Sequence, residues 1–324
     1  MARANVDDQA FEDALKVARM YYHLGLTTTE IARQLGIARP TISRLLGWAR
    51  SHGLVEFRIL DHRERQLRLE TRVEEAFGVR DVKVVPARPD APVAERQRQV
   101  AAFTAHYLNG LVTPGSTISL AWGATVSLLA AKLIPKLLSG LDVVQMNGSG
   151  NSGLGITYAA DLVAAFAANY SARAHLMPIP AYFDDPSTKE AMFRERTIKR
   201  TKQLAARADI AIFSIGVPDA DSYVYQAGYV EDGELAALRA DGVVGDIATV
   251  FFRSDGSYGD IAMNRRSSGP DLASLALHRH SICLVAGEKK LEGVKGALRG
   301  RFLNTLVIDE PTAEALMAQE EATG

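Results

Sequence analysis

Apolar and polar residues between Leu26 and Trp48 recur with the period of two short helices joined by a tight turn. In the first helix three apolar side chains fall on one face: Ile31, Ala32 and Leu35. Thr27 and Glu30 have the spacing of a capping box, in which each side chain binds an orphan amide at the helix start. Gly36 can adopt the left-handed conformation that closes a helix. The pattern therefore predicts a helix from Thr27 that ends at Gly36.

A second helix is predicted from about Arg39, with Pro40 tolerated in its first turn. Its inner face consists of Ile42, Leu45 and Leu46. On the outer face, Arg can pair with guanine through two hydrogen bonds, and Thr and Ser can bind phosphates or base edges. Exposed positions near the start of the second helix of a helix-turn-helix reach the major groove. The residues predicted to contact double-stranded DNA are Thr28, Arg39, Pro40, Thr41, Ser43 and Arg44.

A plainer interpretation of this hairpin is a polar, solvated face on a small helical motif. Ala38 also stands where Ser or Thr would normally cap the second helix. However, segment 30–68 contains eight Arg against four acidic residues, whereas the whole chain has a formal net charge of −1. Such local basicity is typical of a protein that neutralises phosphates at one end.

The neighbouring segments complete the predicted organisation of the chain. Residues 11–24 have helical period and end at Gly25, and Val55, Phe57 and Ile59 alternate like a short strand. An arginine-rich helix over 63–77, with Leu67, Val73 and Phe77 as its apolar points, is expected as a connector. The predicted divisions are a helix-turn-helix domain over 1–60, a linker helix over 61–80 and a large α/β domain over 81–324.

From residue 81 onward, short apolar strands alternate with helices. Strands are predicted at 82–85, 117–121, 142–146, 210–215, 243–252, 282–286 and 306–308. This alternation predicts a Rossmann-like parallel sheet with helices on both faces. Ligands of such sheets bind at the carboxyl ends of the strands, in the loops that lead into helices.

Three loops and one further position are candidates for a ligand site. Loop 122–127, WGATVS, offers amides and hydroxyls that suit an anion such as phosphate, although glycine turns before helices are common. Loop 147–155 is rich in glycine and small polar residues, which suits either a polar ligand or a mobile loop. In loop 286–290, Lys290 can bind a phosphate as a point charge or remain a solvated surface group. Asp246 lies among apolar neighbours and needs a partner if it is buried, such as a sugar hydroxyl or a lysine.

Composition excludes several classes of protein. The balanced charge excludes a chain that binds DNA through bulk charge, including an architectural DNA-binding protein. No apolar run approaches the ~20 residues of a membrane span, and the first residues lack the layout of a signal peptide. The single cysteine, Cys283, excludes an intrachain disulfide and suggests a reducing compartment. The seven His residues show no metal-ligand spacing, so neither a metal nor a cofactor is predicted.

Several motifs together resemble the SorC-type family of bacterial sugar-responsive transcription regulators, which includes deoxynucleoside, central-glycolytic and autoinducer-2 regulators. The matching stretches are GLTTTEIARQLGIARPTISRLLGWARSHGLV, WGATVS, VVQMNG, ADIAIFSIG, GVVGDIATVFF and AGEKKLEGVKGALRGRFLNTLVIDEPTAEALM. The resemblance implies a carboxyl-terminal effector domain related to sugar-phosphate isomerases. It also implies a cytoplasmic homo-oligomer, a dimer or tetramer, whose operator binding is altered by a phosphorylated sugar or related small molecule.

The resemblance also assigns expected roles to residues of the effector domain. Gly123, Ala124 and Thr125 match the turn that holds the effector's phosphate, and Asp246 and Lys290 match positions that contact the effector. Asn147 falls where some deoxynucleoside regulators carry a lysine able to form a Schiff base, which an amide side chain cannot do. The full expected set is Trp122, Gly123, Ala124, Thr125, Asn147, Gly148, Ser149, Asp246 and Lys290.

Two departures from the family pattern leave the ligand open. Ala124 replaces a frequently polar or basic residue, and AGEKK is one glycine shorter than the usual AGGEKK. The effector is therefore either a sugar phosphate, held in the usual or a different pose, or an unphosphorylated polyol. The expected function is a regulator, by default a repressor, of a carbohydrate or polyol operon. The rival is an isomerase-like enzyme with Asp246 and Lys290 as an acid–base pair, although no wider catalytic constellation is present.

Overall fold

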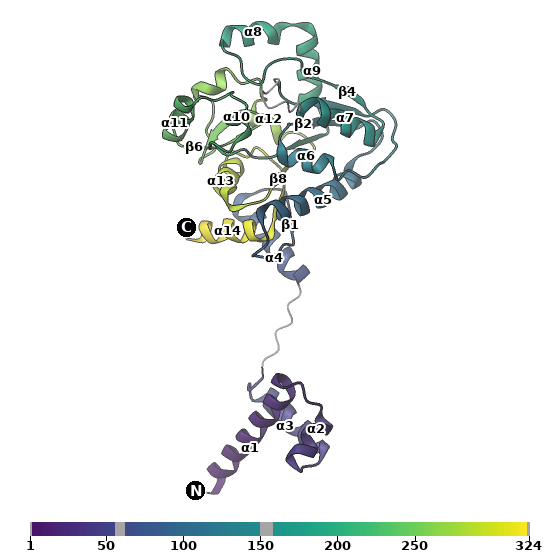
Figure 1. The fold of residues 1–324 in the computed structure, drawn as a ribbon, viewed down its shortest axis with the longest axis vertical. Helices are drawn as coiled ribbons and strands as arrows, with labels where there is room; N and C mark the ends of the chain where they lie inside the picture. The colour runs from purple at the N-terminus through teal and green to yellow at the C-terminus, as the bar shows by residue number, and fades with distance from the viewer. Residues whose placement is uncertain (1, 56–61, 150–157, 323–324) are drawn as a thin grey trace. The chain divides into compact units, whose positions relative to one another are not determined.

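A computed structural model describes residues 2–55, 62–149 and 158–322. The chain forms two compact units, a first unit over Met1–Asp61 and a second over His62–Gly324 (Figure 1). All of the strand predicted from Val55 to Ile59 except Val55, and most of the glycine-rich loop after Asn147, lie outside the described residues.

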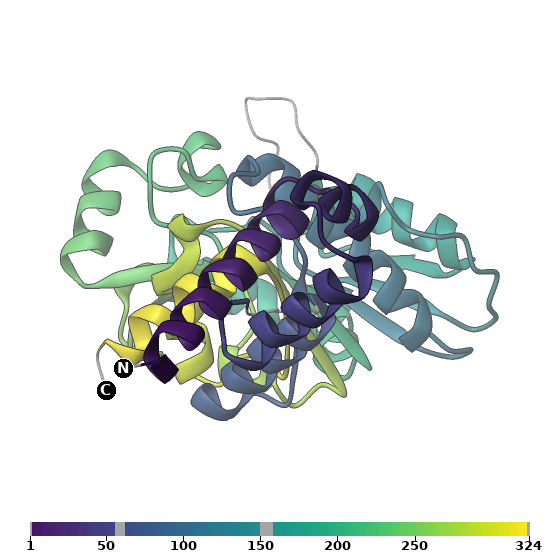
Figure 2. The same cartoon turned by 90° about the horizontal axis from the view of Figure 1, so that it is seen from below.

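The first unit is helical. It consists of α1 (Ala2–Ala18), a π-helical turn (Arg19–His23), α2 (Thr28–Leu35) and α3 (Arg39–Ser51). Helix α1, dark purple in Figure 2, packs on α3. It begins nine residues before the predicted start at 11, because its first turns carry little apolar periodicity. The buried side chains at the centre of the unit are Ala14, Val17, Ile31, Ile42 and Leu46.

The two predicted helices of the hairpin are present, with their local signals in place. The Thr27 hydroxyl accepts a hydrogen bond from Glu30 N at 3.3 Å, and Glu30 Oε2 accepts one from Thr27 N at 2.8 Å. Gly36 closes α2 at φ +68°. Ala38 caps α3 without a side-chain hydrogen bond, and Pro40 lies in the first turn of α3.

The second unit is built on a parallel sheet of seven strands, in the order β1-β9-β8-β5-β2-β3-β4. The strands are β1 (Asp81–Val85), β2 (Thr117–Leu120), β3 (Asp142–Gln145), β4 (Arg173–His175), β5 (Ile210–Phe213), β8 (His280–Val285) and β9 (Thr305–Asp309). Both faces are covered, as the apolar runs predict. Ile210 and Ile212 pack with α5 (Val93–Leu111), α6 (Ala124–Ala130) and α7 (Tyr158–Tyr170), and the intervening Ala211 and Phe213 pack on the other face.

The remaining helices connect the strands or cover the ends of the sheet. They are α4 (His62–Phe77), α8 (Pro186–Arg194), α9 (Arg196–Ala206), α10 (Tyr223–Gln226), α11 (Asp232–Ala240), α12 (Leu272–Leu275), α13 (Leu291–Arg299) and α14 (Glu310–Glu321), with 3₁₀ turns at Ala262–Arg265 and Glu288–Lys290. Within the described residues, no helix is long and apolar enough to cross a membrane.

The helix expected as a connector packs against the sheet of the second unit. Helix α4 contacts β1 and α14 and buries Leu69 and Val73. Glu70 and Glu74 accept hydrogen bonds from the amides of Val84 and Val82 at 2.8 and 2.9 Å, so α4 satisfies the outer edge of strand β1. The expectation that Leu67 lies on its apolar side is wrong, since Leu67 is 62% exposed.

The long strand predicted at 243–252 is an antiparallel hairpin outside the parallel sheet. It consists of β6 (Val243–Ile247) and β7 (Val250–Arg253), joined by Ala248 and Thr249. Both turn residues have positive φ, +48° and +72°, as a tight two-residue hairpin turn requires. Ala and Thr do not signal such a turn, which normally uses Asn or Gly. The sequence pattern therefore predicted one continuous strand.

Candidate functional site

The outer face of α3 carries the residues predicted to contact DNA. Arg39, Pro40, Ser43 and Arg44 are exposed, and Thr28 and Thr41 are partly buried. Neither Arg39 nor Arg44 forms an ion pair with another residue in the described part of the chain. Because α3 buries Ile42 and Leu46 on the side away from Arg44, the packing of the helix holds Arg44 at the surface, and Arg39 is exposed at the start of the helix.

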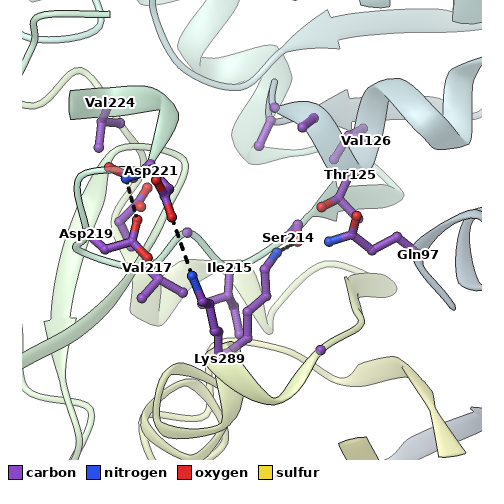
Figure 3. A pocket seen from close by; sticks show the side chains of 18 of the residues that line it. Gln97, Thr125, Val126, Ser214, Ile215, Val217, Asp219, Asp221, Val224 and Lys289 are labelled. Atoms are coloured by element: carbon purple, nitrogen blue, oxygen red, sulfur yellow. Dashed lines mark hydrogen bonds and ion pairs between the residues drawn. The ribbon is translucent and has the colours of Figure 1, made fainter. Parts of the chain in front are cut away.

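A cavity of about 600 Å³ lies in the second unit, at the carboxyl ends of β2, β3, β5 and β8 and beside the β6–β7 turn. Figure 3 shows Gln97 and Thr125 on one side of this cavity and Asp219 and Asp221 on the other. Seven of the nine expected effector residues line it: Trp122, Gly123, Ala124, Thr125, Asn147, Asp246 and Lys290. They come from four separate segments of the chain.

Gly148 and Ser149 are not among the residues that line the cavity. Gly148 accepts a hydrogen bond from the Trp122 indole at 2.7 Å and donates to the Ser268 hydroxyl at 2.9 Å. A Cβ at Gly148 would lie 2.3 Å from the Pro180 carbonyl oxygen. Ser149 N donates to the Ile179 carbonyl at 3.0 Å. These two residues therefore anchor the end of β3 to other segments of the same chain, and Gly148 holds Trp122 in the cavity wall.

The turn after β2 presents small groups to the cavity. Gly123 has φ +150° and precedes α6, so it adopts a backbone conformation that a side chain would disfavour. Thr125 follows on the first turn of α6 and is 7% exposed. The turn thus offers backbone amides and a hydroxyl, with no side chain at Gly123 to block a ligand.

Asp246 is a buried carboxyl group in the wall of the cavity. One of its oxygens accepts a hydrogen bond from Thr249 N at 3.2 Å. Burial raises the pKa of Asp246 to about 6, and the Thr249 hydrogen bond and the charge of Lys290 oppose that rise. A Cβ at Gly216 would lie 2.0 Å from the carboxyl oxygen, so the carboxyl group occupies space that only a glycine leaves there.

Lys290 provides a cation on the same wall. Its ammonium donates a hydrogen bond to the Ser214 hydroxyl at 3.2 Å. Burial lowers the pKa of Lys290, and the nearby Asp246 charge opposes that change. A buried anion and a partly buried cation on one cavity wall can together bind a ligand that carries both hydroxyl groups and negative charge.

Comparisons with known proteins place this arrangement in a family. A family model described as "Putative sugar-binding domain" matches residues 61–318. The deoxyribonucleoside regulator of Bacillus subtilis is 32% identical over 312 residues, which cover 96% of this chain and 99% of the relative. The crystal structure of the full-length sorbitol operon regulator SorC from Klebsiella pneumoniae is similar with a TM-score of 0.71 and 30% identity, covering 96% of this chain and 99% of that one.

The chain belongs to the SorC-type family of sugar-binding transcriptional regulators. The similarity to these two relatives covers 96% of the chain, so it includes both the helix-turn-helix unit and the second unit. Its relatives are named as regulators of transcription and not as enzymes, which favours the regulator over the isomerase-like alternative.

The pocket of this SorC-type regulator also contains residues that the sequence did not single out. Ser214, Asp219 and Asp221 lie on the loop after β5, and Gln97 comes from α5. The rule that ligands bind at the ends of parallel strands could have found Ser214, because β5 was predicted. At the exposed rim, Lys289 Nζ lies 3.4 Å from Asp221 Oδ2, the ion pair drawn in Figure 3.

Behind the cavity, a buried arginine joins its wall to other elements of the regulator. Arg96 on α5 is 3% exposed and donates to Glu288 Oε2 at 2.7 Å and to Asp309 Oδ2 at 2.5 Å. Asp309 caps α14 by accepting a hydrogen bond from Thr312 N. Oε1 of the next residue, Glu310, lies 3.3 Å from Nε of Arg65 on α4. Ionic contacts therefore run from the cavity wall to the helix that follows the first unit in sequence.

Proposed function

We propose that this regulator reads paired operator half-sites with α3 and responds to a small hydroxylated metabolite, a sugar phosphate or a polyol, in the 600 Å³ cavity. The observation that carries the proposal is the convergence of Gly123, Asp246 and Lys290 from separate segments on one cavity. The names of the relatives, a sorbitol operon regulator and a deoxyribonucleoside regulator, support a ligand of this class.

The cavity suits a ligand with two kinds of polar group. Lys290, Ser214 and the amides after Gly123 are hydrogen-bond donors suited to phosphate oxygens. Asp246 is suited to accept hydrogen bonds from sugar hydroxyls. Asn147 is an amide, which excludes covalent capture of a sugar aldehyde at that position.

The ionic contacts behind the cavity support a route to the DNA-reading unit. A ligand beside Glu288 would shift the Arg96 contacts and thereby α14 and α4. The effector can alter operator binding only through different affinities for two arrangements, and a coupling of about 1–3 kcal/mol would be ordinary. We propose repression as the mode of control and a dimer or tetramer in the cytoplasm, because paired readers match operator half-sites about one helical turn, ~34 Å, apart or a multiple of that distance.

Replacing Arg44 with Ala is expected to weaken operator binding by about 1–3 kcal/mol, because the exposed guanidinium can no longer bind a base edge or phosphate. Base preference should also relax at one position of the operator. Fluorescence anisotropy with operator and shuffled duplexes measures both effects. Arg50→Ala is the matched control, since Arg50 is exposed on the same helix but near its carboxyl end. Equal operator preference for Arg44→Ala and the unchanged protein would remove α3 from the proposed interface.

Replacing Lys290 with Ala is expected to abolish the thermal stabilisation that a phosphorylated effector gives, because the cation in the cavity wall would be missing. The screen should pair pentose, hexose and tetritol phosphates with their free polyols and should follow product formation in parallel. Lys289→Ala is the control, since Lys289 lies at the rim and is exposed. A stabilisation that survives Lys290→Ala would exclude Lys290 as the phosphate ligand, and turnover of any sugar phosphate would favour the enzyme.

A further inference from the structure

The α8–α9 hairpin carries an excess of positive charge that the proposed function does not use. Residues 186–207 contain seven Lys and Arg against two Glu, whereas the whole chain has 37 basic against 38 acidic residues. Within the described residues, none of the seven forms an ion pair. The segment therefore keeps an excess of positive charge, although the charge of Glu190 acts on Lys189.

The exposed basic residues of α9 form a stripe along the helix. Arg196 and Arg200 of α9 and Arg207, the C-cap residue that follows it, are exposed, and their spacings of four and seven residues place them on one side. The opposite face is fixed by Ile198 and Ala205, which are buried. Eleven residues of helix extend over roughly 16 Å, and DNA carries one phosphate charge per ~1.7 Å of its axis. The stripe is therefore long enough to lie beside several phosphates.

A groove of about 420 Å³ continues this positive surface beside the stripe. It is lined by Phe193, Arg194, Lys199, Lys202, Gln203 and Ala206. Lys202 Nζ lies 3.4 Å from the centre of the Phe193 ring, and Lys189 Nζ lies 5.7 Å from it. Burial lowers the pKa of both lysines, and the charge of Lys189 lowers that of Lys202 further. An anion bound in the groove would relieve this crowding of like charges.

We propose that this basic surface, formed by Arg194, Arg196, Lys199, Arg200, Lys202 and Arg207, is a second contact with the phosphate backbone of double-stranded DNA. The inference rests on the proposed function, which makes DNA the partner. Lysine and arginine without acidic partners fit phosphates, and such contacts position a protein on DNA without reading its sequence. The surface therefore adds affinity and salt dependence and leaves base preference to α3.

The test uses the full chain with Arg196, Lys199 and Arg200 replaced by Gln. Binding to a random-sequence duplex of about 60 base pairs should weaken, and the slope of log K against log salt should become shallower by ~0.9 for each lost phosphate contact. A control triple replaces Arg88, Lys132 and Arg279, which are exposed elsewhere on the second unit, and should leave the slope unchanged. A charge-keeping triple, Arg196→Lys, Lys199→Arg and Arg200→Lys, should also keep it.

Three further results separate this inference from the alternatives. The double variant Arg39→Ala and Arg44→Ala should keep a residual, salt-sensitive affinity for the random duplex. Adding the Gln triple to this double variant should remove that residual affinity. An unchanged slope for the Gln triple, with operator binding intact, overturns the second contact and leaves the proposed function standing. A change in molecular mass by light scattering, without a change in slope, would identify the surface as a contact between subunits and overturn the inference. Failure of the unchanged protein to bind any duplex would overturn both proposals.

Discussion

Replacing Arg96 with Met is expected to destabilise the second unit by about 3–5 kcal/mol, because one partner of a buried ion pair is removed and the other charge stays buried. Asp309 is fully buried, and Arg96 is the cation that contacts it. Urea denaturation followed by far-UV circular dichroism measures the loss. The same substitution should reduce the effect of the effector on operator binding, because Glu288 in the cavity wall also loses its partner.

Two variants test whether the charge of Asp309 is the cause. Arg98→Met is the matched control, since Arg98 lies on the same helix but is exposed, and it should cost little. Adding Asp309→Asn to Arg96→Met should recover part of the loss, because the amide oxygen can still accept the Thr312 hydrogen bond at the start of α14 without an unpaired charge. A loss that persists in full in the double variant would point to the packing of the Arg96 side chain instead.

The helix-turn-helix of the first unit could be predicted because its signals are local. Thr27, Glu30 and Gly36 each act on a helix end within four residues, so their spacing in sequence is their spacing in space. The parallel sheet was predictable for a similar reason, since each strand is buried on both faces and appears as a continuous apolar run. The hairpin at Ala248 and Thr249 was missed because its turn lacks the residues that usually signal one.

The candidate pocket was only partly predictable, because its walls meet through contacts between distant segments. Gly123 and Lys290 follow strands and could be proposed from the strand-end rule. The Arg96 partners lie 192 and 213 residues further along the chain, and an arginine on an amphipathic helix looks like any surface charge. Gln97 lies on the same helix and gave no signal, since only the packing of α5 against the sheet brings it to the cavity.

Replacing Asp246 with Asn is expected to stabilise the unliganded protein by about 2–3 kcal/mol at pH 7. Folding raises the pKa of Asp246 from 3.8 to about 6, so the charged carboxylate at pH 7 lowers the free energy of unfolding. The folded state then binds the proton more tightly than the unfolded state. The contribution of this group to stability is therefore greatest below about pH 4, falls as the pH rises to about 6, and stays low above that. Urea midpoints measured from pH 4 to pH 7 should show this fall in the unchanged protein and a weaker one in Asp246→Asn.

The same substitution should weaken effector binding, which would explain why a costly carboxyl group is placed in the cavity wall. Asp219→Asn is the matched control, because Asp219 lines the same cavity but is less buried, and it should leave the pH dependence unchanged. A destabilised Asp246→Asn protein would mean that groups of the protein itself already stabilise the carboxylate charge without ligand. A stabilised protein with unchanged effector affinity would mean that Asp246 does not contact the effector. Gain of stability together with loss of affinity is the result expected of a buried charge whose partner is the ligand itself.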